Sequence, residues 1–201
     1  MGQYYVICNV TKREMIKGHF FGEGIKLMEF GMSGEGTMAA LAILLADGNG
    51  RGGGDLNSDD TLANSIIGSW AGDKIVIAGD YADYGKFVTS KDVEGFVNNE
   101  TKKPLKRKEM NLFHLAHEKF KDISGDAYFC LLQDSWLRDN LKKTWKENPR
   151  MADEAVKELI EIIETKEDEL PLLVGRINSK EALAILERKL KGTTYHGKVQ
   201  G

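Results

Sequence analysis

Two glycine runs, 31-GMSGEG-36 and 48-GNGRGGG-54, contain the residue types best suited to bind a ligand. Half of the chain's 22 glycines lie between Gly18 and Gly54. Glycine lets the backbone adopt positive φ and lets another group approach closely. We therefore expect shaped loops at residues 31–37 and 47–60, and in them a site for a small ligand or a nucleotide.

The first run leads directly into the apolar segment 37-TMAALAILLA-46, which is predicted to be a helix. Free N–H groups at a helix N-terminus can hold an anion. The ligand-binding candidates here are Ser33, Gly34, Gly36 and Thr37. The spacing matches neither the P-loop nor the dinucleotide fingerprint. Two interpretations stay open, an anion site or a tight turn capped by Ser33 or Thr37.

Acidic residues around both runs weaken the phosphate interpretation, because residues 27–73 contain seven Asp or Glu against the single base Arg51. Two unit charges at about 4 Å interact by about 4 kcal/mol at an effective dielectric near 20, whereas a helix dipole contributes about 0.3–1 kcal/mol. Carboxylate-rich loops suit Mg²⁺ or Ca²⁺, which could bridge to a phosphate. The metal candidates are Asp47, Asn49 and Asp55, and Arg51 and Gly53 are ligand-binding candidates. The alternative is a solvated acidic loop.

An acidic and aromatic group follows between residues 70 and 84. Tyr81 and Tyr84 could stack on a ring of the ligand or cover the sheet edge, and the ligand-binding candidates of this group are Trp70 and Tyr81. Asp80 and Asp83 come just after the predicted strand 74-KIVIA-78, where carboxylates can act as acids, bases or metal ligands. Aspartate is also a common turn residue, so a structural role is the alternative.

No catalytic set can be assembled, so whether the protein is an enzyme stays open. His114 and His117 do not have the H-E-x-x-H spacing of a zinc site. Cys8 and Cys130 lie in apolar contexts without a neighbouring base, and there is no G-x-S-x-G elbow.

The elements that would position these residues differ between the two halves of the chain. Period-two and β-branched patterns predict a hairpin over Tyr4–His19, a short strand at Ile25–Phe30 and the strand at 74–78, then a turn and an extended stretch over 80–88. The helix at 37–46 is apolar all round and should be buried, and Thr61–Ile67 could form a short helix.

Beyond Thr101 the apolar period approaches 3.6, which predicts helices. Asn148 followed by Pro149 should open a helix to about Thr165, and Asn178 with Glu181 should cap another, ended by Gly192. We expect one α+β domain over 1–201: N-terminal antiparallel strands around one buried helix in residues 1–100, then a mainly helical half in 101–201.

Composition and charge limit the partners. With 201 residues, 41% of them hydrophobic, the chain can bury a core, and it has no long apolar segment or secretory signal. We expect a cytoplasmic protein without membrane contact. The formal net charge of -3 makes nucleic acid an unlikely partner, although 102-KKPLKRK-108 could be a solvated linker or a basic binding patch.

Charge also alternates along the helical half, with an excess of bases in 101–150 and of acids in 151–170. Such faces could support self-association or docking on another protein. A non-catalytic interaction module, such as a phage or host-defence factor, is therefore the alternative to a small-ligand-binding protein.

Four segments carry a family resemblance: MGQYY at the start, FGEGIKLMEFG, DGNGRGGGDL and GSWAGDKIVIAGDYAD. Together they resemble a group of uncharacterised bacterial and phage-type hypothetical proteins, over roughly the first 85 residues. The resemblance implies that the N-terminal part is one unit, and it implies no activity and no catalytic residue.

Overall fold

The computed structural model describes residues 3–48, 56, 65–98, 100–165 and 180–192, which form an α+β fold as expected. The strands are β1 (Tyr5–Asn9), β2 (Glu14–Ile16), β3 (Ile75–Gly79) and β4 (Lys121–Asp122). The α-helices are α1 (Leu27–Gly31), α2 (Thr37–Leu45), α4 (Leu112–Lys119), α5 (Ser124–Leu131), α6 (Ser135–Glu147), α7 (Glu154–Thr165) and α8 (Lys180–Gly192). Short 3₁₀ helices are η1 (Gly18–Phe21), η2 (Lys91–Val93), η3 (Arg107–Glu109) and η4 (Pro149–Met151).

The four strands form one sheet in the order β3-β1-β2-β4. β1 pairs antiparallel with both β2 and β3, with Ile7 opposite Ile16 and Ile77, and β2 pairs parallel with β4. The predicted hairpin and the predicted strand at 74–78 are therefore confirmed. The short parallel pair brings the start of the helical half against the hairpin.

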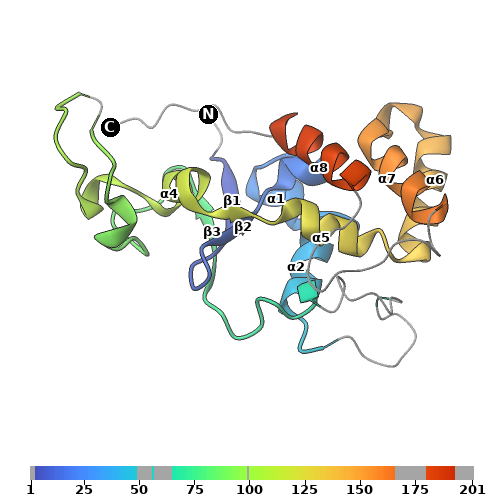
Figure 1. Cartoon of the computed structure of the whole chain (residues 1–201), viewed down its shortest axis with the longest axis horizontal. Helices are drawn as coiled ribbons and strands as arrows, with labels where there is room; N and C mark the ends of the chain where they lie inside the picture. Colours follow the sequence, from blue (N-terminus) through green and yellow to red (C-terminus); the bar gives the residue numbers. More distant parts are fainter. Residues whose placement is uncertain (1–2, 49–55, 57–64, 99, 166–179, 193–201) are drawn as a thin grey trace.

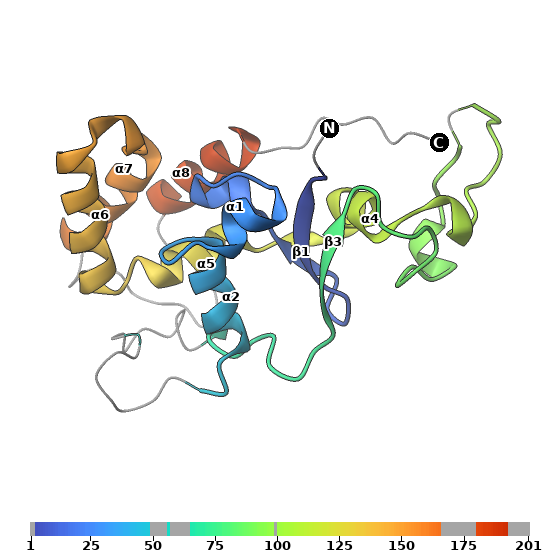
Figure 2. The same cartoon turned by 180° about the vertical axis from the view of Figure 1, so that it is seen from behind.

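Alternation along β1 divides the core between the two sheet faces. Val6 and Cys8 belong to a cluster with Phe113 of α4, whereas Ile7 belongs to a larger cluster with residues of α2, α5, α7 and α8. Figures 1 and 2 show the result, an elongated molecule with the sheet near its middle, α4 towards one end and α6 and α7 at the other.

Helix α2 has the predicted bounds within one residue, and its last turn is tied to the chain before β3. The N–H groups of Gly68 and Trp70 donate to the carbonyls of Ile43 and Leu44, both at 2.8 Å. Thr37, Ala40 and Leu44 are buried, but Ala42 and Leu45 are exposed. Burial of this helix on all sides is therefore not confirmed.

Two N-terminal predictions are wrong. The expected strand at Ile25–Phe30 is instead the short helix α1, whose entry is capped by the backbone N–H of Lys26 donating to Glu29 at 3.0 Å. Both edges of β1 are already paired with β2 and β3. After β3 the expected turn is present, but no strand follows it, because Gly85 and Phe87 adopt φ of 76° and 60° and break the extended path.

The helical half is confirmed, with a correction at its middle. Asn148 makes no side-chain cap, and Pro149 begins η4 rather than the long helix. Helix α7 starts after Asp153, whose Oδ1 accepts hydrogen bonds from the N–H groups of Ala155 and Val156 at 3.0 and 3.2 Å. A local aspartate cap replaced the predicted asparagine cap. The second predicted helix is present as α8, and Gly192 is the last described residue there, so its role in ending the helix stays a prediction. Asn178 and residues 61–64 lie outside the described residues.

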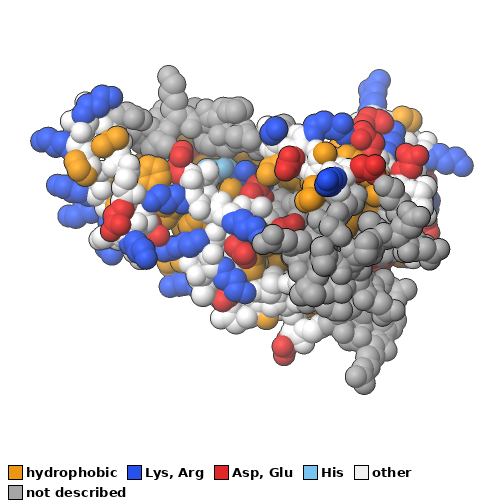
Figure 3. Space-filling model, in the orientation of Figure 1, with side chains coloured by type: hydrophobic (Ala, Val, Ile, Leu, Met, Phe, Trp, Pro, Cys, Tyr) orange, Lys and Arg blue, Asp and Glu red, His pale blue; other side chains and the backbone are white. Residues whose placement is uncertain are grey.

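The basic run 102–108 belongs to a folded loop. The N–H of Leu105 donates to the carbonyl of Phe96 at 2.9 Å, and Val97 bridges Pro104. Its lysines are exposed, and Lys and Arg side chains gather at this end of the molecule, on the left of Figure 3. A role of this loop in binding stays a prediction. Within the described part of the chain, no helix is both long and apolar enough to cross a bilayer.

Candidate ligand-binding site

A cavity of about 500 Å³ lies beside the turn between α1 and α2, and helices α5, α6 and α7 complete its wall. This volume falls within the range of about 300–1,000 Å³ that holds small molecules. Its wall consists of Phe21, Gly22, Glu23, Ser33, Gly34, Glu35, Gly36, Tyr128, Leu141, Thr144, Trp145, Met151, Asp153 and Val156. The first predicted glycine loop thus forms one side of this hollow.

Three of the predicted binding residues, Ser33, Gly34 and Gly36, line this cavity. Ser33 also caps α2, since its Oγ accepts a hydrogen bond from the N–H of Met38 at 3.1 Å. A Cβ at Gly34 would have no atom within 4 Å, so this position borders open space. The turn is therefore capped by Ser33, as the second interpretation predicted, and it also forms a wall of the cavity.

The N-terminus of α2 is occupied by a carboxylate of the protein itself. Glu23 Oε2 accepts hydrogen bonds from the N–H and the hydroxyl of Thr37 at 3.1 and 2.5 Å. A Cβ on Gly36 would lie 1.9 Å from Glu23 Oε1, so glycine lets this carboxylate approach. Glu23 thus takes the position that a bound anion would take. Sequence reasoning missed it, because its 14-residue separation from Thr37 corresponds to no local motif.

The cavity wall is acidic. It carries Glu23, Glu35 and Asp153, and its residues include no Lys, Arg or His. Asp153 forms an ion pair with Lys189, whose side chain is only 7% exposed. In the described part of the chain, Glu35 makes neither a hydrogen bond nor an ion pair. Counted over the described residues, the wall therefore keeps a net negative charge.

Tyr128 gives the cavity a polar group without a partner. The residue is 5% exposed, and its ring packs edge-on against Phe20 and Phe21, with centroids 6.2 and 5.3 Å away. Among the described contacts its hydroxyl makes no hydrogen bond. Burial first, and then the charges of Asp153, Glu23 and Glu35, raise the pKa of Tyr128 above its ordinary value. The phenol is therefore neutral and can donate or accept a hydrogen bond.

Other predicted site residues lie elsewhere. Trp70 is fully buried and its indole N–H donates to Glu14 at 2.8 Å, so it packs in the core rather than against a ligand. Tyr81 is 66% exposed beside a hollow of about 230 Å³ along β3. Asp47 is exposed after α2. The structure does not bring these three residues to the cavity.

The remaining metal and loop candidates, Asn49, Arg51, Gly53 and Asp55, lie outside the described residues. Within the described ranges, no group of three or more His, Cys, Asp or Glu side chains is arranged to hold a metal ion. The predicted Mg²⁺ or Ca²⁺ site at 47–55 therefore stays a prediction.

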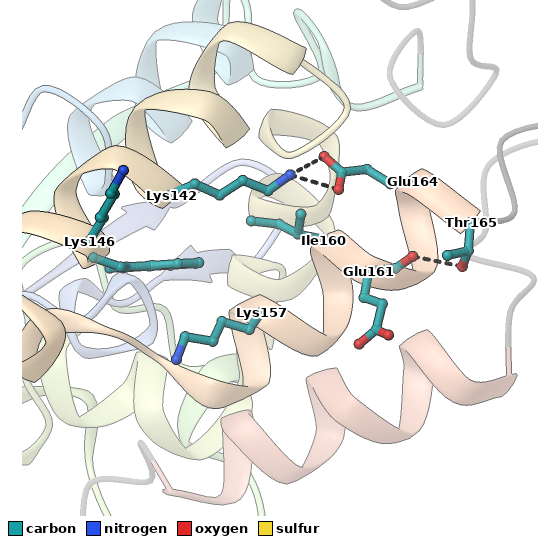
Figure 4. A pocket seen from close by; sticks show the side chains of 8 residues that line it. Lys142, Lys146, Lys157, Ile160, Glu161, Glu164 and Thr165 are labelled. Carbon is teal, nitrogen blue, oxygen red and sulfur yellow. Dashed lines mark hydrogen bonds and ion pairs between the residues drawn. The ribbon is translucent and has the colours of Figure 1, made fainter.

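A second hollow, of about 450 Å³, lies between α6 and α7 (Figure 4). Lys142 reaches across it to Glu164, with Nζ 2.6 and 2.7 Å from the two carboxylate oxygens. Lys157 pairs with Glu154 at 2.8 Å. Oppositely charged side chains of these helices thus form ion pairs within the protein. Trp145 lines both this groove and the acidic cavity.

The chain matches no protein-family model, no curated protein and no solved structure at a significant level. The chemistry of the cavity therefore carries the functional reasoning.

Proposed function

We propose that the chain is a small-ligand-binding protein whose ligand lies in the cavity beside the glycine turn at residues 33–36. The supporting observation is Tyr128, a nearly buried side chain whose hydroxyl borders the cavity without a hydrogen-bond partner among the described residues. A ligand that hydrogen-bonds this hydroxyl would pair a group that has no partner among the described residues, and it would fill a space of suitable volume.

The same geometry disfavours a nucleotide held by its phosphates at α2. Glu23 already satisfies the N–H of Thr37, and the cavity wall has three acids and no base. A phosphate there would meet like charge on several sides. A nucleotide bridged by a divalent cation would need the candidates at 47–55, which makes it a separate hypothesis from the cavity.

The test uses two glycines with matched surroundings. A Cβ at Gly34 or at Gly31 would have no atom within 4 Å, and neither residue has a positive φ. The two differ in that Gly34 lines the cavity and Gly31 does not. Phenylalanine at residue 34 should obstruct the cavity, whereas Gly31→Phe should leave it open. Both variants should remain folded, which circular dichroism would check.

Wild-type protein and both variants would be screened against a library of small metabolites by ¹H–¹⁵N NMR. We expect at least one compound to shift the resonances of cavity residues in wild type and Gly31→Phe, and to lose binding in Gly34→Phe. The proposal is wrong if no compound binds the cavity of the wild-type protein, or if every ligand binds Gly34→Phe equally well.

A further inference from the structure

We infer that the ligand of this cavity is a small organic cation bearing a protonated amine. This inference rests on the proposed function and narrows it to one chemical class. It follows from the charge of the wall, from its aromatic side chains and from the unpartnered hydroxyl of Tyr128.

The described residues balance only part of the negative charge on the wall. Lys189 neutralises Asp153, but Glu23 is held by the neutral N–H and hydroxyl of Thr37, and Glu35 makes no ion pair among the described residues. Two carboxylates therefore face the cavity without a counter-charge. A cationic ligand would supply it, whereas an anion would be repelled by both.

Aromatic side chains line the same space. Phe21, Tyr128 and Trp145 contribute to the wall, and ring faces attract ammonium groups. The protein uses this combination next to the cavity with its own lysine. Lys189 Nζ pairs with Asp153 and lies 5.3 Å from the centroid of the Phe20 ring. A ligand ammonium near Glu35 and Tyr128 would repeat the pairing of one carboxylate with one ring.

Hydrogen-bonding capacity also matches an amine. An ammonium group has three donors and no acceptor, while Glu35 offers carboxylate oxygens and the neutral Tyr128 hydroxyl offers a lone pair. The three carboxylates come from three separate segments: after η1, before α2 and before α7. They are not grouped as metal ligands in the described structure. An extended organic cation fits such spread acceptors better than a metal ion does.

Three four-carbon probes that differ in their end groups test the inference: putrescine with two ammonium groups, 1,4-butanediol with two hydroxyls, and succinate with two carboxylates. Isothermal titration calorimetry near neutral pH and at low salt would compare their affinities for the full chain. We expect putrescine to bind at least about tenfold more tightly than either of the others.

Two variants assign that preference to the cavity. Glu35→Gln should weaken putrescine binding by about tenfold or more, and Tyr128→Phe should weaken it without changing the order of the three probes. Glu161→Gln is the matched control, because it also removes one negative charge, but from α7 at the groove between α6 and α7. It should leave the affinity for putrescine unchanged.

The possible results separate the two proposals. Succinate or butanediol binding as tightly as putrescine would overturn the cation assignment and leave the small-ligand function standing. An affinity for putrescine that Glu35→Gln does not change would overturn it as well. So would failure of all three probes to bind folded wild-type protein at about 10 mM. The proposed function is tested separately, by the metabolite screen of the wild-type protein and of the Gly34→Phe variant.

Discussion

The carboxylate of Glu23 at the start of α2 allows a quantitative prediction, because it satisfies two donors of one buried residue. Thr37 is fully buried, and its N–H and hydroxyl both donate to Glu23 Oε2. Replacing Glu23 with Ala removes the acceptor of both hydrogen bonds. It also removes a negative charge from the positive end of the helix.

The magnitude follows from these contacts. Hydrogen bonds to a charged group contribute about 1.5–3 kcal/mol each, and a charge at a helix N-terminus adds about 0.3–1 kcal/mol. Because Glu23 borders the cavity, water can replace part of its role, so the expected loss lies at the lower end. We expect Glu23→Ala to lower the free energy of unfolding by about 2–4 kcal/mol. Glu23→Gln keeps an acceptor oxygen and should cost about 1 kcal/mol.

Urea unfolding monitored by circular dichroism would measure both values, with an unchanged m-value showing that the transition remains comparable. A double-mutant cycle with Thr37→Val should give a coupling energy of about 1 kcal/mol or more. A loss below about 0.5 kcal/mol for Glu23→Ala, or additive effects in the cycle, would refute the assigned cap.

Sulfate offers a second readout of the same geometry. In wild-type protein the N-terminus of α2 is occupied by Glu23, whereas in Glu23→Ala the N–H of Thr37 is free to bind an anion. Millimolar sulfate should therefore raise the stability of Glu23→Ala more than that of wild type. Equal stabilisation of both proteins would mean that Glu23 does not block an anion site.

Three further predictions concern the scaffold of the cavity and the two sheet faces. Gly68→Ala would bring its Cβ to 2.4 Å from the carbonyl oxygen of Ala46 at a φ of 70°, so thermal unfolding should show a loss of about 2–4 kcal/mol. Gly72→Ala is the control, because Gly72 has a similar φ of 79° but open space around its Cβ position. It should lower the free energy of unfolding by about 1 kcal/mol. Equal losses for the two variants would contradict the steric explanation. Burial, followed by the charge of Lys17, lowers the pKa of His117 from 6.5 to about 4. As pH falls, the unfolded chain therefore binds the proton before the folded protein does. The free energy of unfolding should decrease between pH 6.5 and pH 4, by up to about 1.4 kcal/mol per pH unit. Urea titrations at several pH values should show a shallower dependence in His117→Gln, and an unchanged slope would show that another group is responsible. Asn111 is fully buried, accepts a hydrogen bond from the N–H of His114 at 3.0 Å and donates to the carbonyl of Asp80 at 2.9 Å. Asn111→Ala should therefore cost about 1.5–3 kcal/mol in urea unfolding. Asn111→Asp retains the cap and should cost less, so equal losses for the two variants would mean that the cap contributes little.

The elements that could be predicted are those with strong local signals. The β-branched and aromatic pattern of Tyr5–Asn9 and Ile75–Gly79 predicted strands, and the uninterrupted apolar helix formers that follow Thr37 predicted α2. The error at α1 has a physical cause, since a segment as short as 25-IKLMEF-30 suits a strand or one helical turn equally well. Both edges of β1 are paired with other strands, so this segment cannot pair with β1. The Glu29 side chain caps a helix there instead.

The candidate site shows which part of a binding region is encoded locally and which is not. The closely spaced glycines at 34 and 36 predict a turn from the sequence alone, because glycine is typical of positions where the backbone turns or another group comes close. The partner that approaches Gly36 is set by the path of the chain after η1, which brings Glu23 to the helix, and the facing wall comes from α5, α6 and the start of α7. Counting acids along the sequence indicated a negative environment. The sequence alone could not show that Glu23 already occupies the positive N-terminus of α2, where an anion could otherwise bind. This tertiary contact is the reason why we propose a cationic ligand, since the N-terminus of α2 is filled by a carboxylate and both Glu23 and Glu35 line the cavity.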